Sequence, residues 1–251
     1  MTKNDQPIVL ASDVFLALAL LTRLPVSADH SSSRSNVAVW AYPLAGLVPG
    51  ILAVLAGLLS QTLGLTDSLS ALLALTTLIV TTGAMHEDGL ADTADGFWGG
   101  WNKERRLEIM KDSKIGTYGV LSLLVSFGLR WSALTWLFEA EMAASSILAA
   151  AVLSRACMPV VMSALTHARD TGLSHSVGRV ETTSAAIAIG IAFVLGLILL
   201  GDSVWVALFW AAVATSCMAM LAKRKIDGQT GDVLGATQQI VEIVILLTLV
   251  A

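Results

Sequence analysis

Long apolar stretches alternate with short polar connections along most of this chain. A helix needs about 20 mostly apolar residues to cross roughly 30 Å of hydrocarbon. Seven stretches meet or approach that length, at residues 37–60, 68–85, 118–138, 143–165, 184–200, 204–222 and 233–251. The pattern therefore predicts about seven transmembrane helices.

A further apolar stretch near the start of the chain, residues 8–21, is shorter and contains Asp13. We expect it to form a short interfacial or half-inserted helix rather than a full span. The predicted fold is an all-α, polytopic integral membrane helix bundle of about seven transmembrane helices plus this N-terminal helix. We see no linker, so residues 1–251 are expected to form one membrane domain.

The composition supports a membrane solvent and argues against nucleic-acid binding. Hydrophobic residues make up 55% of the chain and charged residues 14%, and the mean hydropathy is +0.76. Soluble domains carry roughly 25% charged residues. The formal net charge of −4 provides no overall basic field for a nucleic acid.

Lysine and arginine residues lie on alternate connections between the predicted spans. The connections near residues 61–67, 139–141 and 201–203 contain no Lys or Arg, whereas the intervening ones are basic. The positive-inside rule places the basic connections in the cytoplasm. An acidic motif in one of them, "HEDGLADTADGFWGG" (residues 86–100), should then be cytoplasmic, with the C-terminus outside.

This motif contains Glu87, Asp88, Asp92 and Asp95. In a helix Asp88, Asp92 and Asp95 would lie within about 60° of arc, on one face. Like charges so close repel one another unless a cation offsets them. Mg²⁺ binds through a few carboxylates and substrate phosphate oxygens, so all four residues are candidate metal ligands. The alternative is a solvated acidic loop.

The following stretch, "KERRLEIMKDSKIGTYG", contains groups suited to a phosphate. Lys111 and Lys114 bracket Asp112 and Ser113. Cations beside a carboxylate cluster suit a ligand that binds metal at one end and Lys or Arg at the other. The competing explanation is that these cations only set the membrane orientation.

Other ionisable residues fall in or next to predicted spans, where they are costly and usually functional. Asp232 and Glu242 belong to a second polar patch on the cytoplasmic side, residues 223–242. Arg130 and Arg155 lie within spans, and each is expected to face the bundle interior and pair with an acid or an anionic substrate.

Several motifs together resemble one enzyme family. "HEDGLADTADGFWGG" is followed by "RRLEIMKDSKIGTYG", with "LTRLPV" and "YPLAG" upstream and "TGDVLGA" near the end. In this order, and spread over nearly the whole chain, they resemble the cobalamin synthase family of membrane enzymes.

The resemblance implies a Mg²⁺-dependent transferase of a bacterial inner membrane. Such an enzyme joins alpha-ribazole or its 5'-phosphate to adenosylcobinamide-GDP and releases GMP. On this hypothesis, Asp92 or Asp95 accepts the ribose proton, and Lys111 and Lys114 stabilise a phosphate. The expected substrate-binding residues are Asp112, Ser113, Arg155 and Asp232. Partners consistent with the resemblance are the lipid bilayer, a second copy of the chain and other cobalamin-biosynthesis enzymes.

Two other functions remain as alternatives. A CDP-alcohol phosphotransferase also uses spaced aspartates in a membrane helix, but its pattern expects Ala-Arg where this chain has Ala94 and Asp95. A cation transporter would more naturally place its acids at mid-membrane in broken helices. Replacement of Asp92 by Asn should abolish turnover if the enzyme hypothesis is right.

Overall fold

The structure is a computed structural model that describes residues 8–27 and 34–251. The described chain is helical apart from its connections and one isolated bridge between His167 and Gln229. Its helices are α1 (Ala11–Leu21), the 3-10 helix η1 (Ala38–Ala41), α2 (Tyr42–Thr62), α3 (Asp67–Thr82), α4 (Met85–Gly99), α5 (Lys103–Ile109), α6 (Thr117–Glu139), α7 (Ala143–Ala164), α8 (Leu173–Val177), α9 (Thr182–Leu200), α10 (Ser203–Ile226) and α11 (Gly231–Val250). The predicted all-α class is confirmed for the described residues.

Six helical segments of the described chain are long and apolar enough to cross a membrane. They are η1 with α2, then α6, α7, α9, α10 and α11, and they match six of the seven predicted stretches. α3 and α4 form a bent pair that makes a seventh span only if both are counted together. The chain is an integral membrane protein by these criteria.

The predicted span at residues 68–85 is wrong at its end, because α3 stops at Thr82 and α4 leaves it at an angle of 85°. Gly83 and Ala84 have left-handed backbone conformations, with φ of 65° and 56°. A Cβ on Gly83 would lie 2.5 Å from Cγ of Arg23, whose backbone N–H donates to Thr81 at 2.8 Å. This bend turns the acid-rich helix away from the direction of α3.

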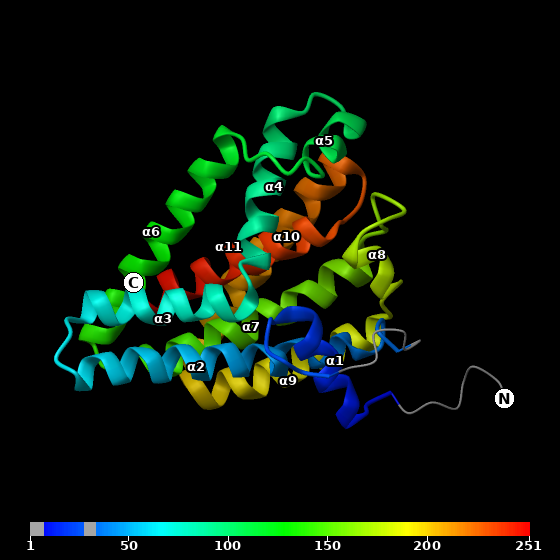
Figure 1. Ribbon diagram of the computed structural model, residues 1–251. Coiled ribbons are helices and arrows are strands. Elements are labelled where there is room, and N and C mark those ends of the chain that lie inside the picture. Colours follow the sequence, from blue (N-terminus) through cyan, green and yellow to red (C-terminus); the bar gives the residue numbers. More distant parts are fainter. Residues whose placement is uncertain (1–7, 28–33) are drawn as a thin grey trace.

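The connections between the long helices gather at two ends of the bundle (Figure 1). α5, α8 and the connection from α10 to α11 lie toward one end, and the α2–α3 connection and Ala251 lie toward the other. We call the first the basic end, because Lys111, Arg169 and Arg224 belong to its connections and helix termini. At the opposite end, connecting residues 63–66, 140–142 and 201–202 contain no Lys or Arg.

α7 is the most buried of the candidate spans, since 78% of an 18-residue apolar stretch of this helix lies inside the protein. Small side chains allow this burial, since Ala149, Ala150 and Ala151 are at most 1% exposed. On the α2 side, a Cβ on Gly46 would lie 2.5 Å from the carbonyl oxygen of Ala151. Small residues at such contacts let helix backbones approach closely in a membrane.

α1 has 11 residues and is too short to span, as expected. Its Asp13 is fully buried and accepts hydrogen bonds from Arg34, from Trp40 and from the backbone of Leu10. Burial alone would raise the pKa of Asp13, but these hydrogen bonds outweigh it and hold the pKa below its usual value. The acid that interrupts the apolar stretch therefore fastens α1 to the start of η1.

Candidate active site

The acid-rich motif forms helix α4 and lies at the basic end against α6 and α11 (Figure 1). Its four acidic side chains have different surroundings. Glu87 and Asp95 are buried, Asp92 is half-buried and Asp88 is exposed. The motif is the helix that the spacing argument assumed and not the alternative acidic loop, but only Asp88 and Asp92 are accessible to a ligand.

A third carboxylate reaches this pair from another part of the chain. Asp232 lies in the first turn of α11. A Cβ on Gly89 would lie 2.7 Å from the carbonyl oxygen of Asp232, so the absence of a side chain at Gly89 lets the two helices nearly touch. Asp232 also forms an ion pair with Arg169, with Nη2 and Oδ2 3.1 Å apart. The structure thus brings the predicted residue Asp232 to the acidic helix.

The repulsion among these acids affects the pKa of Asp92. Burial, and then the charges of Asp88, Asp232 and Asp95, raise the pKa of Asp92 to about 7, against a smaller opposing effect of Arg169. A carboxylate cluster of this kind is stabilised by bound positive charge. The site is therefore suited to a cation.

The predicted four-carboxylate metal site, however, is not assembled. Among the described residues no group of three or more His, Cys, Asp or Glu side chains is arranged to hold a metal ion. Mg²⁺ commonly uses only one or two protein carboxylates and completes its shell with water and substrate phosphates. Asp88 with Asp92 or Asp232 fits that mode, whereas Glu87 and Asp95 are engaged elsewhere.

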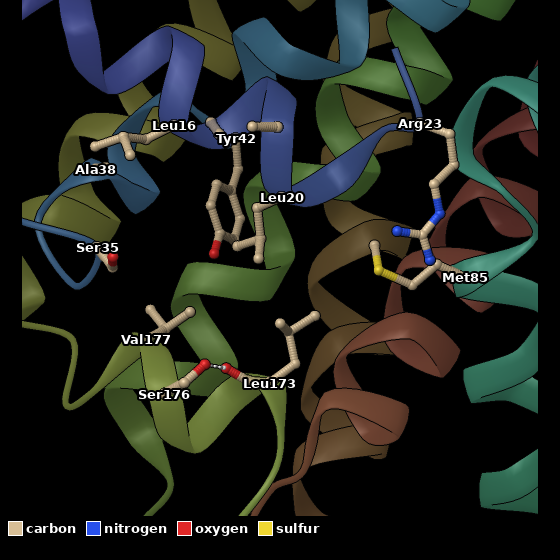
Figure 2. Close-up of a pocket in the computed structure, with 12 residues that line it drawn as sticks. Leu16, Leu20, Arg23, Ser35, Ala38, Tyr42, Met85, Leu173, Ser176 and Val177 are labelled. Atoms are coloured by element: carbon tan, nitrogen blue, oxygen red, sulfur yellow. Dashed lines mark hydrogen bonds between the residues drawn. The ribbon is translucent and has the colours of Figure 1, made fainter. Parts of the chain in front are cut away.

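A cavity of about 110 Å³ adjoins the acids, and Asp88, Asp232, Arg169 and His86 line its polar side. Two nitrogen atoms of these residues, Nε2 of His86 and Nη1 of Arg169, are buried without a hydrogen-bond partner. Buried polar atoms are normally paired, so these two nitrogen atoms are exceptions among the residues of this wall. A larger cavity lies beside this one, under α1 (Figure 2).

Asp95 is an anchor for α6 rather than a free ligand. Its two carboxylate oxygens accept hydrogen bonds from the backbone N–H groups of Gly116 at 2.7 Å and Gly119 at 2.9 Å. These are the unpaired donors at the start of α6, where a negative charge is favourable. A Cβ on Gly116 would lie 2.5 Å from Asp95 Oδ1. The glycines of "KIGTYG" thus allow α4 and α6 to meet.

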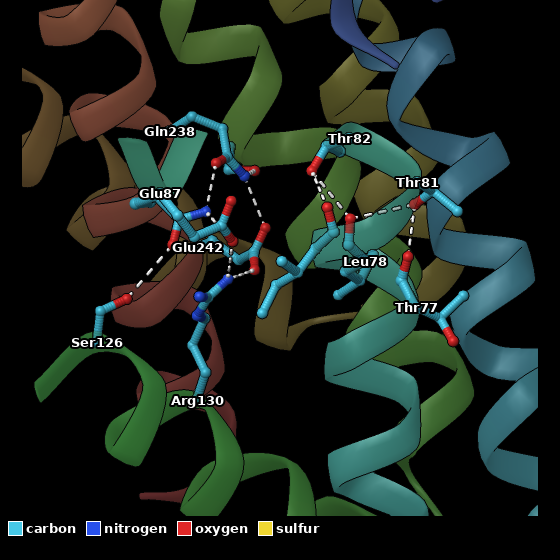
Figure 3. A network of polar contacts seen from close by, with 12 residues as sticks. Thr77, Leu78, Thr81, Thr82, Glu87, Ser126, Arg130, Gln238 and Glu242 are labelled. Carbon is cyan, nitrogen blue, oxygen red and sulfur yellow. Dashed lines mark hydrogen bonds and ion pairs between the residues drawn. The ribbon is translucent and has the colours of Figure 1, made fainter. Parts of the chain in front are cut away.

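Glu87 belongs to a buried polar network inside the bundle (Figure 3). It pairs with Arg130 at 3.1 Å, and Arg130 also pairs with Glu242 at 3.3 Å. Gln239 donates to Glu87 and Gln238 donates to Glu242. The expectation that Arg130 pairs with acids in the interior is confirmed, and Glu87 is one of those acids.

The predicted phosphate-binding residues lie in the connection from α5 to α6. Lys111, Asp112, Ser113 and Lys114 are all exposed. Lys111 donates to the hydroxyl of Thr171, at 3.3 Å, in the same α7–α8 connection that contains Arg169. Asp112 accepts the backbone N–H of Lys114. This loop is accessible to solvent and contacts a segment of the site through Lys111.

Arg155 lies away from the cavity. It is 2% exposed, and its Nη1 donates to the carbonyl oxygen of Ala151 in its own helix, at 3.0 Å. It does not line either cavity beside the acids. Its predicted contact with substrate therefore has no support in this arrangement.

Sequence reasoning missed Arg169, which it counted only as a sign of membrane orientation. No spacing pattern links Arg169 to Asp232, 63 residues later in the chain. His86 carried a weak signal, since it directly precedes the acids. Only the fold shows that both residues share a cavity.

Comparison with known proteins gives a consistent assignment. A family model described as cobalamin-5-phosphate synthase matches residues 13–250. A protein of Bradyrhizobium diazoefficiens named adenosylcobinamide-GDP ribazoletransferase is 46% identical over 243 residues, covering 96% of this chain and 94% of the relative. Proteins of the same name from Mesorhizobium japonicum and Sinorhizobium medicae are 38% and 39% identical, over 96% and 93% of this chain and 93% and 94% of the relatives.

No solved structure matches the chain. The family match spans almost every helix described above, from α1 to α11, and includes the acidic motif and Asp232. The chain therefore belongs to the cobalamin-5-phosphate synthase family.

Proposed function

We propose that this chain transfers the adenosylcobinamide phosphate group from adenosylcobinamide-GDP to a ribose hydroxyl of alpha-ribazole or its 5'-phosphate. The ribose oxygen bonds to the phosphorus that carries adenosylcobinamide. The bond from that phosphorus to the bridging oxygen of the diphosphate breaks, and the bridging oxygen leaves with GMP. Family membership and the names of the relatives support this reaction.

The structural observation that carries the proposal is the meeting of α4 and α11 at a cavity. Asp88 and Asp92 come from one helix, Asp232 comes from the other, and Arg169 joins them from a connection. Phosphoryl transfer is catalysed mainly by positioning and by neutralising the charge of phosphate oxygens. Phosphoryl transfer therefore needs carboxylates that hold a metal and an arginine that binds phosphate.

Each accessible acid has a separate role in the proposal. Asp88 and Asp232 would hold Mg²⁺, which supplies positive charge to the diphosphate oxygens. Asp92 accepts the proton of the ribose hydroxyl. A base works best when its pKa lies near the working pH, and the pKa of Asp92 is raised to about 7. Asp95, the other predicted base, has both oxygens occupied by α6.

The neighbouring cations are assigned to the phosphate groups. Lys111 and Lys114, in the exposed connection to α6, would stabilise the departing phosphate of GMP. Arg169 lines the cavity and pairs with Asp232, and in the proposal its guanidinium also binds a substrate oxygen.

The proposed location is a bacterial inner membrane, with the site on the cytoplasmic side. The basic end, which contains α4 and the cavity, also contains the connections rich in Lys and Arg. Such connections remain in the cytoplasm. A large polar substrate would then enter from water.

The test is GMP release by the purified protein in detergent, with Mg²⁺, adenosylcobinamide-GDP and alpha-ribazole. Asp92→Asn should lower turnover at least a hundredfold, by about the loss expected of a general base, and should keep Mg²⁺-dependent thermal stabilisation. Asp88→Asn should lose both turnover and the thermal stabilisation by Mg²⁺. Wild-type turnover by Asp92→Asn would refute its role, and cation flux into liposomes without GMP release would favour a transporter.

A further inference from the structure

The cavity under α1 has no role in the reaction as described so far. Its volume is about 330 Å³, within the range of roughly 300–1,000 Å³ that is typical of small-molecule sites. Polar residues form a substantial part of its wall, namely Arg23, Ser35, Tyr42 and Ser176 (Figure 2). The hydroxyl of Tyr42 points into the cavity. This wall suits a ligand with oxygen atoms.

Arg23 is the charged residue of this wall, and the bend before α4 holds it in place. Its backbone N–H donates to the carbonyl oxygen of Thr81, at 2.8 Å. Its side chain lies across Gly83, where an added Cβ would lie 2.5 Å from Cγ and 2.7 Å from Nε of Arg23. Arg23 is exposed, and none of the ion pairs between described residues includes it. A positioned guanidinium without a carboxylate partner favours an anion, and its planar fork matches phosphate oxygens.

The accessible acids of α4 lie between Arg23 and the two lysines that are assigned to GMP. Arg23 lies next to Met85, the first residue of α4 (Figure 2). Near the other end of α4, Asp95 binds Gly116, at the end of the connection that contains the lysines. About 15 Å of helix separates Met85 from Asp95, at about 1.5 Å per residue. The acids therefore have a cationic group on each side along the helix.

This order matches the geometry of the proposed reaction. In phosphoryl transfer the attacking and departing oxygens are roughly in line, on opposite sides of the phosphorus. The departing GMP is assigned to the lysines at one side of the acids, so the attacking molecule belongs on the side of Arg23. A cation on that side has a partner in a phosphorylated acceptor and none in the free nucleoside.

We propose that Arg23 binds the 5'-phosphate of the acceptor in the cavity under α1, and that this contact selects alpha-ribazole 5'-phosphate over alpha-ribazole. The inference rests on the proposed function, which leaves both acceptors open. The ribose reaches the acids across the wall that the two cavities share, which includes Leu20, Met85 and Leu173. Arg23 thus determines specificity without touching the reacting atoms.

Two other phosphates compete for this position. The diphosphate of adenosylcobinamide-GDP is assigned to Asp88 and Asp232, and neither residue lines the cavity under α1. A phospholipid headgroup is the second competitor, because α1 is apolar and lies at the edge of the bundle (Figure 1). The wall shared with the acidic cavity favours a ligand that continues toward the acids, as the acceptor does and a lipid does not.

The first test measures the KM for each acceptor in Arg23→Gln, by GMP release. Loss of the guanidinium from a phosphate should raise the KM for alpha-ribazole 5'-phosphate at least about tenfold. The KM for alpha-ribazole, the KM for adenosylcobinamide-GDP and kcat should stay within about twofold, because the contact is the same in the ground state and the transition state. Arg23→Lys should give an intermediate KM, since lysine keeps the charge but not the fork.

Arg224→Gln is the matched control. Arg224 is also an exposed arginine at the basic end, but it lies in the last turn of α10 and lines neither cavity. This variant should keep the wild-type preference between the two acceptors. Lys114→Gln provides a contrast, because it should lower turnover and still keep that preference.

The second test measures binding without turnover. Titration calorimetry without the donor should show that the wild-type protein binds alpha-ribazole 5'-phosphate at least about tenfold more tightly than alpha-ribazole. In Arg23→Gln this difference should disappear. Ribose 5-phosphate should compete with alpha-ribazole 5'-phosphate in the wild-type protein, and the amount of co-purified phospholipid should be the same in both proteins.

Failure of this inference is distinguishable from failure of the proposed function. If the wild-type protein releases GMP and both Arg23 variants keep its preference between the acceptors, the phosphate site is wrong. A raised KM for adenosylcobinamide-GDP alone would assign Arg23 to the donor, and loss of co-purified phospholipid with unchanged KM values would assign it to a lipid; either result overturns the inference. If GMP is never released, the reaction is refuted, and calorimetry with the two acceptors still decides the role of Arg23.

Discussion

Gly89→Ala is the smallest change that tests whether the acids must be held in place by the contact of α4 with α11. The added methyl would lie 2.7 Å from the carbonyl oxygen and 3.1 Å from Cα of Asp232. Both atoms are backbone, so the contact cannot be relieved by turning a side chain. The helices must separate by about 0.7 Å to reach the 3.4 Å of an ordinary contact.

Two effects on stability oppose each other in this variant. Alanine improves helix propensity by about 1 kcal/mol relative to glycine, whereas overpacking a well-packed contact costs about 1–3 kcal/mol. The net loss of stability is therefore small, at most about 2 kcal/mol. Activity should fall more steeply, because a misplacement of about 1 Å at a reacting group can cost on the order of a hundredfold. We expect kcat to fall at least about tenfold.

Gly99→Ala provides the matched control on the same helix. Its methyl would lie 3.5 Å from Cδ1 of Ile109, an ordinary contact. The assay is GMP release at saturating substrates, with the melting temperature measured in the same detergent. If Gly89→Ala and Gly99→Ala both keep the wild-type rate, the spacing between α4 and α11 does not control the reaction, and the proposed role of Asp232 fails with it.

Three further results are expected. Asp95→Asn should lower stability by about 1.5–3 kcal/mol through its lost bonds to α6, and chemical denaturation would show a larger loss than in Asp92→Asn; equal stabilities would contradict the anchoring role. Because the folded-state pKa of Asp92 is raised to about 7 from an ordinary value of 3.8, stability without divalent cations should fall as pH rises through that interval; melting scans should show that Asp92→Asn or added Mg²⁺ weakens this dependence. Arg130→Met should destabilise the fold by about 3–5 kcal/mol, since it leaves Glu87 and Glu242 buried without their shared cation; an unchanged melting temperature would contradict this.

The spans were predictable because membrane solvent imposes a length and an apolar composition on each helix. The bend before α4 could not be predicted from the sequence. It depends on the left-handed backbone at Gly83 and Ala84 and on the packing of Arg23 against Gly83. Hydropathy averages over some twenty residues and contains no information about a two-residue change of direction. A glycine at the end of an apolar run was the one available signal.

The acidic helix itself was predictable, but the partners of its side chains were not. Periodicity gives the angle of each side chain around the helix axis. Whether Asp95 faces a ligand or the start of α6 depends on where α6 begins in space. Likewise Glu87 is committed to Arg130, which is 43 residues away in sequence. Long-range packing thus reduced four candidate ligands to two accessible ones and added Asp232.

The contacts of α4 with its neighbours explain why Asp88, Asp92 and Asp232 stay together despite their repulsion. α4 is fixed to Arg130 through Glu87, to the start of α6 through Asp95, and to α11 through the bare backbone of Gly89. Three attachments along 15 residues leave the helix little freedom to rotate or withdraw. Asp88 and Asp92 therefore cannot relieve their repulsion with Asp232 by a movement of α4 away from α11. A bound cation or proton is the remaining way to lower its cost, and a helix held in this way is already positioned for the metal and phosphate that the proposed reaction requires.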